Sequence, residues 1–156
     1  MANYRTTVTS PASAETAYRY LADFASIIDW DPSVSEAALV SGEPGELGAR
    51  YRVVVSIPLR TIPLEYEIVE ASPPTSANSP AKVALRAQNA DVDSYDVITF
   101  EPRTDGGTDV TYDAQLTGRG FRRVFDPFFG VVMQLIGQRA RSGLMDALGA
   151  LPAARP

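Results

Sequence analysis

The sequence contains no histidine and no cysteine. Without cysteine there are no disulfides, zinc–thiolate sites or iron–sulfur clusters, and without histidine there are no common catalytic triads, zincin motifs or imidazole-ligated haem. Carboxylates alone remain to hold a metal, and they favour magnesium or calcium. We expect no metal and no other cofactor, in a protein that works by enclosing a small, mostly apolar molecule.

Long basic runs and long apolar runs are also missing. The formal net charge is -5, and no long run of lysine or arginine gives the basic surface that non-specific binding of nucleic acid needs. The N-terminus has no apolar stretch of signal-peptide length, and no run reaches the ~20 residues of a membrane span. We expect a cytoplasmic protein that binds no nucleic acid and does not insert stably into membranes; its oligomeric state stays open.

The length of 156 residues fits one compact domain with a substantial core. A hydrophobic fraction of 45% with 21% charged residues is an ordinary globular mixture. We expect a single ligand-binding domain over residues 1–151, followed by a short C-terminal tail, 152–156.

The N-terminal pattern predicts a strand and then two short helices. Residues 5–9 are β-branched, Ser10 and Pro11 break the strand, and Ser13 precedes an acidic first turn. Apolar residues then recur at helical spacing as far as Phe24, and a second short helix or turn precedes Pro32.

From about residue 34 to residue 117 the period of the apolar residues changes to two. This alternation predicts strands over 34–40, 50–57, 61–68, 82–87, 98–101 and 110–116, separated by turns such as 105–107 and by the proline-rich loop 72–80. The prediction is an antiparallel sheet with one apolar face and one wet face.

The last predicted element is a long helix. Asp126 and Pro127 supply an N-cap and a proline at the first helical position, and apolar residues continue to Leu148. A helix over 127–148 is roughly 33 Å long, about the width of seven strands. The stripe that must be buried comprises Phe129, Val132, Ile136 and Ala140, flanked by Phe128, Met133 and Leu144.

This order of elements resembles the START-like family of polyketide cyclases and dehydrases. The residues that carry the resemblance are Pro11 with Tyr20-Leu21-Ala22-Asp23-Phe24, Trp30-Asp31-Pro32, Gly48-Ala49-Arg50-Tyr51, Gly106-Gly107-Thr108, Asp126-Pro127 and Gly143-Leu144. The resemblance implies an α+β helix-grip fold, in which a curved antiparallel sheet of about seven strands wraps around the C-terminal helix and leaves a cavity. Family members include lipid binders and aromatic polyketide cyclases, so the resemblance alone settles no chemistry.

Three tyrosines, Tyr51, Tyr66 and Tyr112, share the apolar parity of their strands. Either they place hydroxyl groups in the cavity, or they are ordinary core or surface aromatics. Tyr95 has the opposite parity and is expected to point outward.

Asp96 shares parity with Ile98 and Phe100, so its carboxylate can face the interior, where desolvation would raise its pKa. It is then a ligand contact or a proton acceptor, and the single catalytic candidate. The competing reading, favoured at this point, places Asp96 at the wet end of the strand, capping a turn or pairing with an arginine.

The predicted ligand-binding set combines the sheet's apolar parity with the helix stripe. It comprises Trp30, Tyr51, Val53, Val55, Leu64, Tyr66, Leu85, Asp96, Ile98, Tyr112, Ala114, Phe129, Val132, Met133, Ile136 and Gly143. Trp30 either gates one end of the cavity or plugs the core. Gly143 either lets the sheet backbone approach the helix or leaves room for ligand, and Arg139 reaches in or, more readily, snorkels outward.

Other charged residues have simpler interpretations. Arg119, Arg122 and Arg123 form a basic collar ahead of the long helix, solvated by default and otherwise an anion contact. Asp23, Asp29 and Asp31 are read as caps and turns rather than as a metal site.

Three functions follow. The leading one is binding of a small hydrophobic or aromatic ligand, such as a lipid, sterol-like or polyketide-like molecule, for transport or sequestration. The first alternative is an aromatase/cyclase or dehydratase in which tyrosine, aspartate or arginine groups assist proton transfer. The second is docking of residues 121–136 on a membrane or a partner protein.

Overall fold

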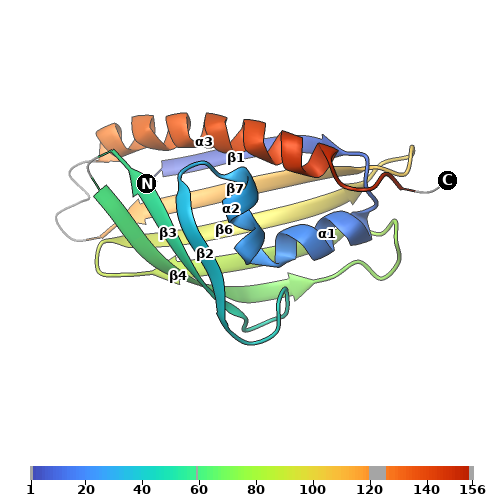
Figure 1. Cartoon of the computed structure of the whole chain (residues 1–156), viewed down its shortest axis with the longest axis horizontal. Coiled ribbons are helices and arrows are strands. Elements are labelled where there is room, and N and C mark those ends of the chain that lie inside the picture. The colour runs from blue at the N-terminus through green and yellow to red at the C-terminus, as the bar shows by residue number, and fades with distance from the viewer. Residues whose placement is uncertain (1, 59, 120–125, 155–156) are drawn as a thin grey trace.

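The computed structural model describes residues 2–58, 60–119 and 126–154, and side chains over the same ranges apart from residues 2 and 126–133. The chain order is β1 (Ala2–Ser10), α1 (Ala14–Ala22), the 3-10 turn η1 (Phe24–Ser26), α2 (Ile27–Trp30), β2 (Val34–Ser41), β3 (Arg50–Ile57), β4 (Arg60–Ser72), β5 (Ala81–Gln88), β6 (Val92–Pro102), β7 (Thr108–Gly118) and α3 (Asp126–Gly149). This order and the layers in Figure 1 confirm the predicted α+β helix-grip architecture.

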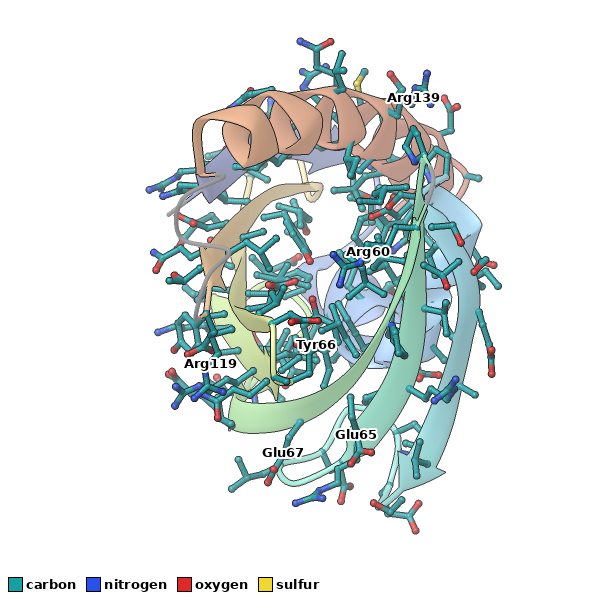
Figure 2. All side chains as sticks on the ribbon, turned by 90° about the vertical axis from the view of Figure 1, so that its left-hand side faces the viewer. Arg60, Glu65, Tyr66, Glu67, Arg119 and Arg139 are labelled. Carbon is teal, nitrogen blue, oxygen red and sulfur yellow. The ribbon has the colours of Figure 1, made fainter. Side chains whose placement is uncertain are left out.

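The sheet has seven antiparallel strands in the order β1-β7-β6-β5-β4-β3-β2. It bends into an arch that α3 closes from above (Figure 2). Alternation along β4 puts Tyr66 inside this arch, whereas Glu65 and Glu67 lie on its outer face and reach Arg50 at 3.3 Å. The predicted division into an apolar inner face and a wet outer face is therefore confirmed on this strand.

The N-terminal segment follows its local signals. Ser13 caps α1, with its side-chain oxygen accepting a hydrogen bond from the Thr16 amide at 3.2 Å. The first strand begins earlier than the predicted residue 5, because β1 pairs with β7 along its whole length, from Ala2 opposite Leu116 to Ser10 opposite Thr108. That pairing joins distant parts of the sequence and has no local signature.

Two glycines let α3 sit close to its neighbours. A Cβ built on Gly137 would lie 2.3 Å from the ring of Tyr4 on β1. A Cβ on Gly143 would lie 1.9 Å from the backbone carbonyl oxygen of Trp30. Both explanations offered for Gly143 are therefore wrong in detail, because the backbone that approaches it belongs to α2 and not to the sheet, and this contact fills the space.

Candidate functional site

A cavity lies between the curved sheet and α3, with about 880 Å³ of empty space including its opening to solvent. Its walls come from β1, β3, β4, β6 and β7 on the sheet side, from the segment around α2, and from α3. Most of the lining is apolar: Ile27, Val34, Val53, Val55, Ile62, Leu64, Val92, Ala114, Leu116, Ile136, Ala140 and Leu144, with Tyr4, Thr6 and Gly137 beside them. A lining of this kind, apolar with a few polar groups, is typical of sites for small apolar molecules.

Four polar side chains on the inner face of the sheet form one hydrogen-bonded group, which we call the Asp96 network: Tyr66, Ser94, Asp96 and Tyr112. The Ser94 hydroxyl donates to Asp96 Oδ1 at 2.8 Å, and the Tyr112 hydroxyl donates to Asp96 Oδ2. The Tyr66 hydroxyl lies 3.1 Å from Ser94 Oγ. Register explains the assembly, because Asp96 lies opposite Ala114 on β7, and period-two alternation keeps all four residues on the inner face.

Asp96 is only 2% exposed, and burial raises its pKa from 3.8 to about 6. Hydrogen bonds from Tyr112 and Ser94 oppose this rise, while the negative charges of Asp31 and Asp113 add to it. The favoured reading of Asp96 as a turn cap or arginine partner is therefore wrong. The carboxyl lies in the cavity wall, and it changes its charge close to neutral pH.

The two tyrosines of the network stay protonated at neutral pH. Burial raises the pKa of Tyr66 and of Tyr112 well above 10.0, and the negative charge of Asp96 raises both further. Each phenol therefore keeps its proton, and its hydroxyl can donate one hydrogen bond and accept others.

A second carboxylate, Asp31, also lines the cavity. It accepts hydrogen bonds at Oδ1 from the Ser33 amide, at 2.9 Å, and from the Ser33 hydroxyl, at 2.7 Å. Burial raises its pKa, and these bonds oppose the rise. The sequence analysis predicted that Asp31 forms a turn, and its hydrogen bonds to Ser33 agree with this. It did not predict that Asp31 also lines the cavity.

Trp30 forms part of the same wall and is 4% exposed. The ring packs edge-to-face against Tyr112, with centroids 5.4 Å apart. Its indole Nε1 is buried and has no hydrogen-bond partner among the residues that the structure describes. A buried donor without a partner is uncommon, and here it belongs to a residue that lines a cavity.

Of the predicted ligand contacts, those that line the cavity are Trp30, Val53, Val55, Leu64, Tyr66, Asp96, Tyr112, Ala114 and Ile136. Tyr51, Leu85, Ile98 and Gly143 do not line it. The Tyr51 hydroxyl instead accepts a hydrogen bond from the Gly45 amide at 2.9 Å, in the loop between β2 and β3. Alternation predicts which face of the sheet a side chain occupies, but not whether its position along the strand lies beside the cavity. For this reason the sequence pattern alone predicts the same site for Tyr51 and Tyr66.

Phe129, Val132 and Met133 lie outside the described side chains, and Arg122 and Arg123 lie outside the described residues. Most of the segment 121–136, considered for docking, falls in the same region. Arg119 is exposed and donates to the Asn89 carbonyl at 3.1 Å, while Arg139 lies on the outer side of α3 (Figure 2).

Sequence reasoning missed several lining residues. Ser94 had a usable signal, because it shares parity with Asp96 and Ile98. Tyr4 and Thr6 had none, since their place depends on the pairing of β1 with β7. Arg141 of α3 also lines the cavity, although its side chain is exposed and its guanidinium contacts Met145 Sδ at 3.1 Å.

No three carboxylates gather into a potential metal site in the described ranges 2–58, 60–119 and 126–154. Nor is any helix within those ranges both long enough and apolar enough to cross a membrane.

Comparisons with known proteins agree with this geometry. The sequence model described as "Polyketide cyclase / dehydrase and lipid transport" matches residues 1–151. No curated protein matches the chain. Among solved structures, a Thermus thermophilus protein superposes with a TM-score of 0.72 at 17% identity, covering 94% of this chain and 96% of its own.

Two further solved structures that are similar to this chain have names that describe a function. A STAR-related lipid transfer protein fragment from Xanthomonas axonopodis has a TM-score of 0.68 at 17% identity, covering 94% of this chain and 85% of its own. An aromatase/cyclase from a Streptomyces species has a TM-score of 0.66 at 12% identity, covering 94% and 90%. At these identities the similarity establishes the fold alone.

Proposed function

The chain belongs to the polyketide cyclase/dehydrase and lipid transport family, and we propose that it binds a small, mainly apolar molecule in the cavity beneath α3, as a carrier or sequestering protein. The observation that carries this proposal is the cavity itself: a mainly apolar chamber whose wall holds two hydrogen-bonded polar groups, the Asp96 network and the pair Asp31–Ser33. Apolar walls supply affinity for such ligands, and a few fixed polar groups orient them.

The chemistry of the wall supports this function. Burying apolar ligand surface contributes roughly 25 cal/mol per Å², and Val53, Leu64 and Leu144 are among the apolar residues that line the cavity.

The direct test is native mass spectrometry of gently purified protein, followed by binding of an apolar fluorescent dye, anilinonaphthalene sulfonate, to the ligand-free form. Ala140→Phe places a ring in the cavity from α3 and is expected to weaken dye binding at least ~10-fold by occupying the space. Ala150→Phe, just beyond α3 at an exposed position, is the matched control. Equal dye affinity in a folded Ala140→Phe variant and in the wild type contradicts binding in the cavity.

A second candidate function, proton transfer on an enolisable substrate of the polyketide type, is favoured by one observation. Asp96 is a buried carboxylate with a pKa of about 6 that accepts hydrogen bonds from Tyr112 and Ser94 in the cavity wall. A base is most useful when its pKa lies close to the working pH. The test is deuterium exchange at the acidic C–H of a 1,3-diketone, with Asp96→Asn expected to abolish any acceleration by the wild type; no acceleration by the wild type contradicts this function.

A further inference from the structure

The hydrogen-bond directions in the Asp96 network determine what the cavity offers to a ligand. Ser94 has one hydroxyl proton, and it points to Asp96 Oδ1, so the Tyr66 hydroxyl must donate to Ser94. The Tyr112 hydroxyl likewise donates its only proton to Asp96. With Asp96 ionised, every proton of the network is directed inward, and the groups left to a ligand are acceptor lone pairs.

Asp31 adds to this acceptor surface. Both hydrogen bonds that the described residues donate to it arrive at Oδ1, and Oδ2 accepts none from them. Its negative charge acts on Asp96, Tyr66 and Tyr112, which places it near all three. A ligand that reaches one carboxylate is therefore within the field of both.

The two carboxylates have no cationic partner among the described residues. None of the ion pairs that the described residues form, Arg60–Asp91 included, involves Asp31 or Asp96. Arg141 is the one described basic residue that lines the cavity, and it is exposed and contacts Met145. Asp113, behind Asp96 on β7, adds a further negative charge. Buried carboxylates are stabilised by a cation, so this end of the cavity is matched to a positive ligand.

Aromatic rings line the same cavity as the two carboxylates. Trp30, Tyr66 and Tyr112 all line the cavity, and the faces of such rings attract a cation. The Nε1 of Trp30 is itself buried, so we assign it no contact with the ligand. Thr6 supplies a hydroxyl that can serve either way.

We propose that the ligand is a small apolar amine: a hydrophobic or aromatic body carrying a protonated amino group that donates to Asp96 and Asp31. The inference rests on the proposed binding function and narrows it. Ligands whose polar end is a carboxylate, such as fatty acids, are disfavoured by the same two aspartates.

Three probes with one aromatic body separate these chemistries: 1-naphthylmethylamine, 1-naphthalenemethanol and 1-naphthoate. Binding is measured by calorimetry on ligand-free protein at about pH 7.5, because at this pH both the amine and Asp96 are charged. A hydrogen bond between charged groups is stronger than a neutral one, so the amine is expected to bind about 10-fold or more tighter than the alcohol, and the carboxylate weakest.

Substitutions assign the preference to its residues. Asp96→Asn and Asp31→Asn are each expected to reduce the preference for amine over alcohol by about 10-fold, while affinity for the alcohol stays within about 2-fold. Asp29→Asn is the control, because Asp29 is exposed and bonded to Tyr20 outside the cavity. Asp31→Asn leaves the hydrogen bonds of the Asp96 network intact and gives an independent measurement if Asp96→Asn folds poorly.

The outcomes separate the two proposals. If the alcohol or the naphthoate binds, is blocked by Ala140→Phe, and equals or exceeds the amine in affinity, the amine inference is overturned and cavity binding stands. An amine preference that survives both Asp31→Asn and Asp96→Asn also overturns it. If no probe and no dye binds, or if Ala140→Phe changes nothing, the binding function itself fails.

Discussion

The pH dependence of stability gives the sharpest test of the buried carboxyl, through the substitution Asp96→Asn. In the unfolded chain the carboxyl has its ordinary pKa of 3.8, and in the folded chain burial raises that pKa to about 6. The folded state therefore holds the proton more tightly, and ionisation of Asp96 opposes folding.

The sign and the size follow from these two values. Below pH 3.8 the group is protonated in both states and its ionisation costs nothing; the cost grows between 3.8 and 6 and is complete above 6. At 1.36 kcal/mol per pKa unit the full cost is about 3 kcal/mol, of which about 2 kcal/mol arises between pH 4.5 and pH 7.5.

The assay is urea unfolding of ligand-free wild type and Asp96→Asn at these two pH values. The free energy of unfolding of the wild type, relative to the variant, is expected to fall by about 2 kcal/mol as the pH rises. Other titrating groups are present in both proteins and cancel to first order. A difference between wild type and Asp96→Asn that stays constant with pH refutes the buried, proton-binding carboxyl.

Two further predictions concern packing and capping, and urea unfolding measures both. Gly143→Ala is expected to lower the free energy of unfolding by at least ~1–3 kcal/mol, because the new Cβ would lie 1.9 Å from the Trp30 carbonyl oxygen. Gly149→Ala, whose new Cβ would meet no neighbouring atom within 4 Å, is the control and is expected to be neutral or stabilising by up to ~1 kcal/mol. Equal effects of the two substitutions would contradict the close approach of α2 to α3. Ser13→Ala is expected to cost about 1 kcal/mol by removing the acceptor for the Thr16 amide, and Ser13→Thr, which keeps an acceptor, should recover most of this; an unchanged free energy of unfolding in Ser13→Ala would refute the cap.

Much of the fold is readable from local patterns because those patterns are repeated and redundant. Alternation in β4 and β6 separates inner from outer residues, as Tyr66 and Asp96 show against Glu65 and Tyr95. Asp126 and Pro127 mark the start of α3, and Ser13 marks the start of α1. Each of these signals lies within a few residues of the element that it predicts.

The site is less readable because it depends on distances along strands and on pairing between distant segments. Tyr51 and Tyr66 are directly paired on β3 and β4, yet the Tyr51 hydroxyl bonds to the β2–β3 loop while Tyr66 joins the Asp96 network. Tyr4 enters the cavity wall through the long-range pairing of β1 with β7. Parity alone distinguishes none of these outcomes.

The energetics of Asp96 connect stability to function. A carboxylate whose ionisation costs about 3 kcal/mol is a poor way to hold a sheet together, since an apolar residue there would fill the same wall without that cost. The cost becomes useful when a cationic ligand binds, because the cation stabilises the charged carboxyl and recovers part of the energy as affinity. The groups that the cavity presents around Asp96 are oxygen acceptors and aromatic rings, which suit a ligand that donates hydrogen bonds.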